Sequence, residues 1–261
     1  MTNLFIVKIG GNIIDDEKKL SSFLKDFAAI EDEKILVHGG GKMATDLAGK
    51  LGIPQQMIAG RRITDAETLK VVTMVYAGII NKTIVAKLQA GNCNAIGITG
   101  ADGNSILAHK RIHPTIGYGY AGDVDAINAP FIQNLLEQNS TPVFAPITHD
   151  KKGQLLNTNA DTIAQEIAKA LSPLYQVQLI YCFEKNGVLA NINDDSSVIS
   201  EITPIAYASL KKENKIFEGM IPKLDNAFAA LQSGVRKVIL GKAENLHQLI
   251  NATAGTRIIN G

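Results

Sequence analysis

Several features that mark whole classes of protein are scarce or missing in this sequence of 261 residues. It contains no tryptophan, only two cysteines, and 5% aromatic residues. Cys93 and Cys182 stand far apart in apolar surroundings and form no C-x-x-C pair. A disulfide framework and a zinc site are therefore not expected, and the two thiols should be reduced and packed in the interior.

The sequence also lacks an excess of charge of either sign. Lysine and arginine number 26, and aspartate and glutamate 25, so no bulk field attracts nucleic acid or an anionic membrane. No apolar run approaches the roughly 20 residues that span a bilayer, and no basic segment followed by an apolar one opens the chain. We expect a cytoplasmic protein whose partners are small molecules or other subunits, with no nucleic acid and no membrane.

The first strand and the turn that follows it are the most informative stretch. Leu4 to Val7 is apolar without a break, which predicts a strand buried on both faces in the centre of a parallel sheet. Lys8 and then Gly10 and Gly11 follow at its carboxyl end, where open α/β sheets bind ligands. The pattern indicates an anion site, for which phosphate is the natural ligand. A lysine that reaches solvent beside an ordinary glycine turn explains the same residues.

Strand-like and helix-like segments alternate along the whole chain, which predicts an α/β fold with a mostly parallel sheet and helices on both faces. Ser172-Pro173 is the best candidate for a lobe boundary, giving lobes 1–172 and 173–261. Strands are expected near 4–9, 35–38, 94–99, 142–147, 177–181, 237–240 and 256–259, and helices near 20–30, 43–51, 64–91, 127–138, 160–171 and 246–250, with two more after Pro204 and Pro222.

Two segments invite a functional interpretation of their structure. Thr64 and Glu67 form a capping box that should start the longest helix, and apolar residues on more than one face of it favour a subunit interface. The glycine-rich and aromatic segment 117–124 is either a flexible lid or a plain loop.

The second glycine turn, His38-Gly39-Gly40-Gly41, lies between a buried strand and a helix N-terminus. Its free N–H groups and the helix dipole favour a carboxylate or a phosphate, although a tight strand-helix connection would look the same. It matches neither the G-x-x-x-x-G-K-[ST] loop nor the G-x-G-x-x-G turn, since Met43 follows Lys42. Arg62, just before a helix, could bind a carboxylate bidentately or lie on the surface.

Two later stretches add polar groups. In Asn157-Thr158-Asn159-Ala160-Asp161 a helix cap needs only one residue, so the surplus suggests that amides bind ligand while Asp161 orients nearby cations. Lys223 falls in the first turn of a helix, where the dipole disfavours a cation unless an anion such as phosphate is present. Surface lysines are common at such positions.

In this order, the motifs resemble those of the amino acid kinase family over nearly the whole chain. They are Val7-Lys8-Ile9-Gly10-Gly11, Val37-His38-Gly39-Gly40-Gly41, Gly60-Arg61-Arg62-Ile63-Thr64, Asn157-Thr158-Asn159-Ala160-Asp161 and Gly219-Met220-Ile221-Pro222-Lys223. The resemblance implies a three-layer sandwich with an open, mostly parallel sheet of about eight strands. It places acylglutamate binding and dimerisation in lobe 1–172 and ATP binding in lobe 173–261. The family members that this sequence most resembles phosphorylate the side-chain carboxylate of N-acetyl-L-glutamate in arginine biosynthesis, so the resemblance implies the same activity for this chain.

The resemblance also implies roles for single residues. Lys8, Lys223 and Asp161 would act on the phosphoryl group, and Gly40, Gly41, Arg62 and Asn157 would hold the acylamino acid. Nucleotide contacts are expected from Gly10, Gly11, Glu184, Lys185, Gly187 and Phe217, although relatives usually carry Thr/Ser-Asp-x-x-Gly where this chain has Phe183-Glu184-Lys185-Asn186-Gly187. ATP and Mg²⁺ are the expected cofactors, with Mg²⁺ held mainly by the nucleotide phosphates and no dedicated metal ligands.

Alternatives within and outside the family remain. Kinases of aspartate, glutamate, carbamate or UMP fit the Arg62 and Asn157 motifs less well, and a catalytically dead amino-acid sensor should have lost one of the two lysines. N-succinyl-L-glutamate is an alternative substrate if Lys42, with Arg61 nearby, neutralises its third carboxylate. A homodimer through the helix 64–89 is expected. Only three residues precede strand one, without the extra helix of arginine-inhibited hexameric relatives, so we expect insensitivity to arginine.

Overall fold

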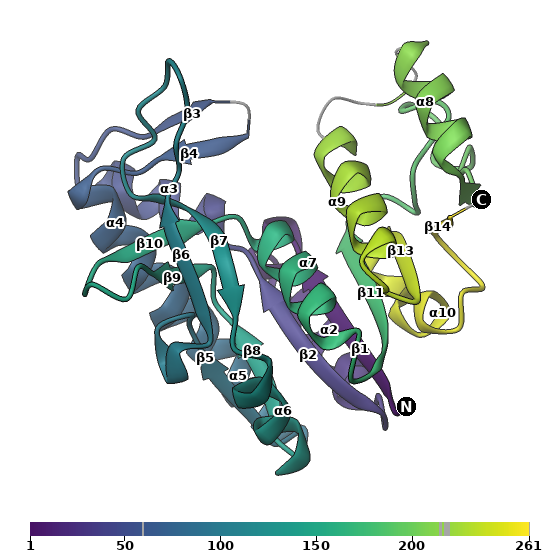
Figure 1. Ribbon diagram of the computed structural model, residues 1–261, viewed down its shortest axis with the longest axis horizontal. Coiled ribbons are helices and arrows are strands. Elements are labelled where there is room, and N and C mark those ends of the chain that lie inside the picture. The colour runs from purple at the N-terminus through teal and green to yellow at the C-terminus, as the bar shows by residue number, and fades with distance from the viewer. Residues whose placement is uncertain (59, 214–215, 217–219, 261) are drawn as a thin grey trace.

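The computed structural model describes residues 1–58, 60–213, 216 and 220–260, and it shows an open sheet with helices on both faces (Figure 1). The sheet has eight strands in the order β12-β14-β13-β11-β1-β2-β8-β5, and only the pair β13–β14 is antiparallel. The predicted α/β class and mostly parallel sheet are confirmed. Its strands are β1 (Asn3–Ile9), β2 (Glu33–His38), β5 (Ala95–Ile98), β8 (Thr141–Phe144), β11 (Gln176–Phe183), β12 (Glu201–Ile202), β13 (Lys237–Lys242) and β14 (Thr256–Ile258).

Alternate side chains of β1 point into two separate cores. Leu4 and Ile6 join the core on one face of the sheet, whereas Phe5 and Val7 join the core on the other face. All four are essentially buried, and each contributes about 1.5–3 kcal/mol of transfer free energy.

The helices are α1 (Gly11–Ile14), α2 (Glu17–Ala28), α3 (Gly41–Lys50), α4 (Ala66–Thr73), α5 (Asn81–Ala90), α6 (Ala129–Glu137), α7 (Ala160–Leu171), α8 (Pro204–Lys212), α9 (Ile221–Gln232) and α10 (Leu246–Ile250), with short 3₁₀ turns at Asp102–Asn104 and Ala243–Asn245.

The position of β1 in the middle of the sheet determines where a ligand can bind. β1 runs parallel to β2 on one side and to β11 on the other, so Lys8 lies beside Val37 and Tyr181. The carboxyl ends of the three strands therefore meet at one edge, and the two glycine turns after β1 and β2 lie next to each other there. Gly39 N–H donates to the Ile9 carbonyl at 3.2 Å, which joins the turns directly.

The longest helix is continuous from Ala66 to Ala90 but has three parts, because the π-helical segment η1 (Met74–Ile80) separates α4 from α5. The predicted capping box is wrong: the cap is Asp65, whose side chain accepts from the Thr68 N–H at 2.7 Å. Thr64 is displaced from that role because its hydroxyl donates to the Arg62 carbonyl and accepts from Asn157. By length and composition alone this helix could cross a membrane, and 44% of its most apolar window is buried inside the protein.

Four short strands close into a small barrel beside the sheet (Figure 1): β6 (Ile106–Lys110), β7 (Ala121–Ile127), β9 (Ile147–His149) and β10 (Leu155–Thr158). The strand predicted at 142–147 is in fact two, since β8 ends at Phe144 in the main sheet and β9 begins at Ile147 in the barrel. Residues 121–124 belong to β7 rather than to a lid or loop. The preceding loop is fastened to Thr64, which bonds the backbone of Tyr118 and Tyr120 at 3.1 and 2.7 Å.

A two-stranded ribbon, β3 (Gln56–Ile58) and β4 (Arg61–Ile63), completes the fold. It projects from the part of the chain that precedes the long helix, and it lies near α3 and β10 (Figure 1). Arg61 and Arg62 are on β4, so the ribbon carries two adjacent cations toward the carboxyl edge of the central sheet.

Candidate functional site

Three charged side chains from distant parts of the sequence meet at the carboxyl end of β1. Lys8 Nζ lies 2.6 Å from Asp161 Oδ1, and Lys223 Nζ lies 2.5 Å from Asp161 Oδ2. Lys8 comes from β1, Asp161 from the first turn of α7, and Lys223 from the first turn of α9. The side chain of Asp161 is 14% exposed, so one buried carboxylate joins two ammonium groups.

Burial and pairing act in opposite directions on these groups. Burial raises the pKa of Asp161, but the ammonium groups of Lys8 and Lys223 more than offset this and hold the pKa of Asp161 well below its usual range. Burial lowers the pKa of Lys8 in spite of the nearby carboxylate, and Lys223 lowers it further. The cluster carries a net charge of +1 with both lysines protonated, which suits it to an anion.

The helix α7 is built to present Asp161 at this point. The side chain of Asn159 caps the helix by accepting from the N–H groups of Asp161 and Thr162 at 2.8 and 3.1 Å. Asn159 therefore has a structural task, and Asp161 is left free to pair with the lysines. One residue of the motif thus caps the helix, and the side chain of Asp161 contacts both lysines.

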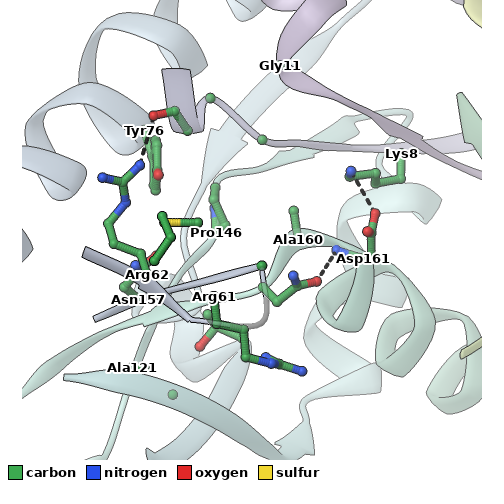
Figure 2. A pocket seen from close by; sticks show the side chains of 18 residues that line it. Lys8, Gly11, Arg61, Arg62, Tyr76, Ala121, Pro146, Asn157, Ala160 and Asp161 are labelled. Atoms are coloured by element: carbon green, nitrogen blue, oxygen red, sulfur yellow. Dashed lines mark hydrogen bonds and ion pairs between the residues drawn. The ribbon is translucent and has the colours of Figure 1, made fainter. Parts of the chain in front are cut away.

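A first cavity, of about 240 Å³, lies on one side of the cluster and is shown in Figure 2. The expected substrate residues Gly40, Gly41, Arg62 and Asn157 all line it, as do Lys8 and Asp161. Figure 2 shows Lys8 and Asp161 at one end of this cavity and Arg62 with Tyr76 at the other. A molecule bound here would have one end beside the lysine cluster and the other beside a guanidinium.

The guanidinium of Arg62 makes several hydrogen bonds within the protein. Its Nη2 donates to the Gly41 carbonyl at 2.8 Å and to the Thr45 hydroxyl at 2.9 Å, and its Nη1 donates to Gln55. The guanidinium thus braces the start of α3, and a carboxylate that bound it bidentately would have to replace some of these acceptors. Asn157 Nδ2 likewise donates to Thr64 Oγ1 at 3.0 Å.

A second cavity, of about 390 Å³, lies on the other side of the cluster and is lined mainly by the end of β11 and by the segment 184–192 that follows it. Its lining combines apolar residues with glycines and charged groups. Among them are the expected nucleotide contacts Gly10, Gly11, Glu184, Lys185 and Gly187. Phe217, also expected there, lies outside the described residues. Lys185 is paired with Asp195 at 2.7 Å, so its charge is partly neutralised.

The two cavities share three lining residues, Lys8, Gly11 and Asp161. The lysine cluster therefore stands at the junction of two binding spaces. Two ligands bound at the same time would meet there, with a pair of cations between them.

Comparison with known proteins agrees with this geometry. The profile of the amino acid kinase family matches residues 3–242. The chain belongs to the amino acid kinase family.

Individual proteins are similar to the chain over nearly its whole length. The chain is 56% identical to an acetylglutamate kinase of Cytophaga hutchinsonii, over 99% of both chains, and 53% identical to an acetylglutamate kinase of Parabacteroides distasonis, over 99% of this chain and 100% of the other. Among solved structures, smu.665 from Streptococcus mutans is 28% identical with a TM-score of 0.82, and 99% of each chain is covered.

This amino acid kinase has site residues that sequence reasoning did not identify. Met57, Tyr76, Pro146 and Thr158 also line the first cavity, and the second has an apolar part formed by Val188, Leu189, Ile192, Ile216 and Met220. Tyr76 looked like one more apolar position of a long helix. No local signal distinguishes such residues, since they become neighbours of the site only through the fold.

Among the described residues no group of three or more histidine, cysteine, aspartate or glutamate side chains could hold a metal. Asp161 is the carboxylate nearest to the junction, and both of its oxygens already face lysines. This donor set does not form a protein cage for Mg²⁺, which usually keeps water and phosphate ligands in enzymes of phosphoryl transfer. It fits an ion held mainly by nucleotide phosphates.

Proposed function

We propose that the chain transfers the γ-phosphoryl group of ATP to the side-chain carboxylate of N-acetyl-L-glutamate, a step of arginine biosynthesis. The observation that carries the proposal is the junction of the two cavities at Lys8 and Asp161, with Lys223 on the nucleotide side. The names of the relatives at 56% and 53% identity support the same activity and substrate.

The chemistry needs few catalytic groups. A side-chain carboxylate with an ordinary pKa of about 4.3 is ionised at neutral pH, so it is a nucleophile without a general base. The bond between the γ-phosphorus and the bridging oxygen of ADP breaks while a bond to the carboxylate oxygen forms. The main obstacle is repulsion between two anions, and fixed cations counter it best.

Each residue of the cluster has a part in this scheme. Lys8 and Lys223 would stabilise the negative charge that spreads over the transferring group, and Asp161 would hold both ammonium groups in position. Gly10 and Gly11 on the nucleotide side, and Gly40 and Gly41 on the acceptor side, offer backbone N–H groups without obstructing side chains. Bound Mg²⁺ would add charge neutralisation at the phosphates.

The acceptor end of the first cavity supports a small dicarboxylic substrate. Arg62, Asn157 and the glycine turn would hold the α-carboxylate and the acyl group, while the side-chain carboxylate reaches the cluster. Met57, Tyr76 and Pro146 provide apolar surface suited to the acetyl group. Kinases of UMP or carbamate would need a different shape at this end.

N-succinyl-L-glutamate is the second candidate substrate, and the position of Arg61 favours testing it. Lys42, the other cation considered for this substrate, is exposed on α3 and does not line the cavity, so it does not support this candidate. Arg61 does line the cavity, and no hydrogen bond or ion pair ties its guanidinium to another group in the described part of the chain. It could receive a third carboxylate.

The division of labour between lobes is also part of the proposal. All residues that line the first cavity precede position 172, whereas most of those that line the second follow it. Residues 1–172 would bind the acylamino acid and residues 173–261 ATP. We further propose a cytoplasmic homodimer through the helix of residues 64–89, because Met74 and Ile79 on η1 are 55% and 58% exposed.

A coupled assay of ADP release tests the activity. The purified protein is incubated with ATP, Mg²⁺ and, separately, N-acetylglutamate, N-succinylglutamate, glutamate, aspartate or UMP. The proposal expects N-acetylglutamate to give the highest kcat/KM. A preference for free glutamate, aspartate or UMP would contradict it, and a preference for the succinyl compound that Arg61→Ala abolishes would select the second candidate. A protein without any activity would fit an amino-acid sensor, although such a protein has no need of both lysines.

A further inference from the structure

A buried histidine stands directly behind the acceptor-side glycine turn. His38 is the last residue of β2, its side chain is 0% exposed, and it lines neither of the two cavities. Its Nδ1 lies 2.8 Å from the Gly39 carbonyl oxygen, and its Nε2 lies 3.1 Å from Asn81 Nδ2. A carbonyl can only accept, so Nδ1 carries the proton and Nε2 accepts from the amide of Asn81.

Asn81 completes this assignment. Its amide nitrogen also donates to the Val143 carbonyl at 2.9 Å, which uses its second N–H, and its oxygen accepts from Lys82 Nζ at 3.1 Å. Every polar atom of both side chains thus has a partner. Burial lowers the pKa of His38 to about 4, so the imidazole is neutral at physiological pH and keeps this one tautomer.

The pair controls the orientation of one peptide unit. The Gly39 N–H donates to Ile9 O, and the Gly39 carbonyl is held by His38, so both polar groups of Gly39 are fastened to the interior. In a trans peptide the carbonyl and the next N–H point in opposite directions. Since the Gly39 carbonyl points inward, the Gly40 N–H is directed to the opposite side, where Gly40 lines the first cavity.

The Gly40 N–H has no hydrogen-bond partner in the part of the chain that the structure describes, so it is available to a ligand. The turn also has little freedom on its other side. Gly40 has a φ of +145°, and a Cβ there would lie 2.2 Å from Ile80 Cδ1. Gly40 therefore packs closely against Ile80, the last residue of η1. Asn81, the partner of His38, is the next residue and begins α5.

We propose that His38 and Asn81 are positioning residues that hold the Gly40 N–H toward an anionic group of the acceptor substrate. They do so through the Gly39–Gly40 peptide and touch no substrate themselves. The inference rests on the proposed function, because it takes the acceptor to be an acylated amino acid with a carboxylate in the first cavity. It adds a device that preorganises the turn before the substrate arrives.

Two substitutions of His38 separate its two hydrogen bonds. The amide nitrogen of asparagine occupies the place of Nδ1, so His38→Asn can still donate to the Gly39 carbonyl. The amide group of glutamine reaches the place of Nε2, so His38→Gln can still pair with Asn81 but releases Gly39. Both variants are polar and remove ring volume. Ser105→Ala is a control, since Ser105 is fully buried and its hydroxyl bonds only the Thr99 carbonyl, at 2.9 Å, among the described residues.

Steady-state kinetics of ADP release gives KM for N-acetylglutamate and for ATP separately. Loss of one directed N–H to a carboxylate predicts that His38→Gln raises KM for N-acetylglutamate by about tenfold or more. KM for ATP should stay within about twofold, and His38→Asn should raise the acceptor KM by about threefold at most. The melting-temperature increase caused by N-acetylglutamate alone measures the same difference without turnover.

Equal acceptor KM in the wild type and His38→Gln, or a parallel rise in both KM values, would overturn the proposal and leave a buried pair with a purely structural role. If His38→Gln does not fold, the test passes to Asn81→Ala, which must raise the acceptor KM selectively. A wild type that does not phosphorylate N-acetylglutamate would instead refute the proposed function, before any variant is compared.

Discussion

The carboxylate of Asp161 should be essential to both the stability and the turnover of this kinase, and Asp161→Asn tests this with almost no change of volume. The substitution removes the one negative charge between Lys8 and Lys223, which lie 2.6 and 2.5 Å from its oxygens. Both ammonium groups then face each other with a neutral amide between them. The net charge of the cluster rises from +1 to +2.

The expected loss of stability follows from burial. Removing one partner of a buried ion pair costs about 3–5 kcal/mol, and the side chains of Lys8 and Asp161 are only 11% and 14% exposed. For a chain of this size a loss of 1 kcal/mol lowers the melting temperature by about 2–4 °C, so the drop should be about 6–20 °C. Since the lysines lose their fixed position, kcat should fall by about 100-fold or more.

Differential scanning calorimetry and ADP release measure the two effects, and nucleotide adds a third. A polyphosphate supplies the missing negative charge, so an ATP analogue that is not hydrolysed should raise the melting temperature of Asp161→Asn more than that of the wild type. Glu201→Gln is the matched control, because its pair with Arg257 at 2.8 Å is solvent-exposed and worth about 1 kcal/mol or less. If Asp161→Asn has the same melting temperature as this control and keeps wild-type turnover, the role assigned to Asp161 is refuted.

Further expectations concern other parts of the chain. Lys8→Met and Lys223→Met should each lower kcat more than they raise either KM, because the lysines stabilise charge that develops during transfer, and near-wild-type turnover in either variant would contradict this. The pKa of His38 is about 4 in the folded state against 6.5 ordinarily, so the unfolded chain binds the proton first and stability should decrease by about 3 kcal/mol as pH falls from 6.5 to 4. Urea denaturation across this range should show a shallower decrease in His38→Asn, and identical slopes would count against the assignment. Light scattering should show a homodimer of the wild type and a weaker dimer of Ile79→Glu. A monomeric wild type would exclude the proposed dimer.

Much of the fold could be predicted because its signals are local. Apolar runs that end in Lys8-Ile9-Gly10-Gly11 and in His38-Gly39-Gly40-Gly41 gave buried parallel strands with glycine turns at one edge, as the structure shows. Asp161 in the first turn of α7 and Lys223 in that of α9 followed from helix boundaries. The expected residues of both cavities line them, apart from Phe217, which the structure does not describe.

The errors arose where tertiary contacts decide between similar local patterns. Thr64 and Asp65 can both cap a helix, and Thr64 lost that role because its hydroxyl bonds Asn157, 93 residues away. The apolar segment 142–147 reads as one strand, yet it turns at Ala145-Pro146 from the main sheet into the barrel. Periodicity cannot reveal such a change of sheet.

The polar pair behind the glycine turn illustrates the same limit. Asn81 is 43 positions from His38 and looks like an ordinary polar residue of a long helix. Its contact with the imidazole depends on how the helix packs on β2 and β8, and on the π-helical segment that sets its angular position. Neither feature has a signature in the sequence.

Direct identification of the product tests the central claim most closely. Transfer to a carboxylate yields an acyl phosphate, which hydroxylamine converts to a stable hydroxamate, so the reaction is run with ATP, Mg²⁺, N-acetylglutamate and hydroxylamine and examined by mass spectrometry. We expect one N-acetylglutamyl hydroxamate, with the new group on the side-chain carbonyl, for each ADP released. ADP accompanied by inorganic phosphate without hydroxamate, or a hydroxamate on the α-carboxyl group, would contradict the account.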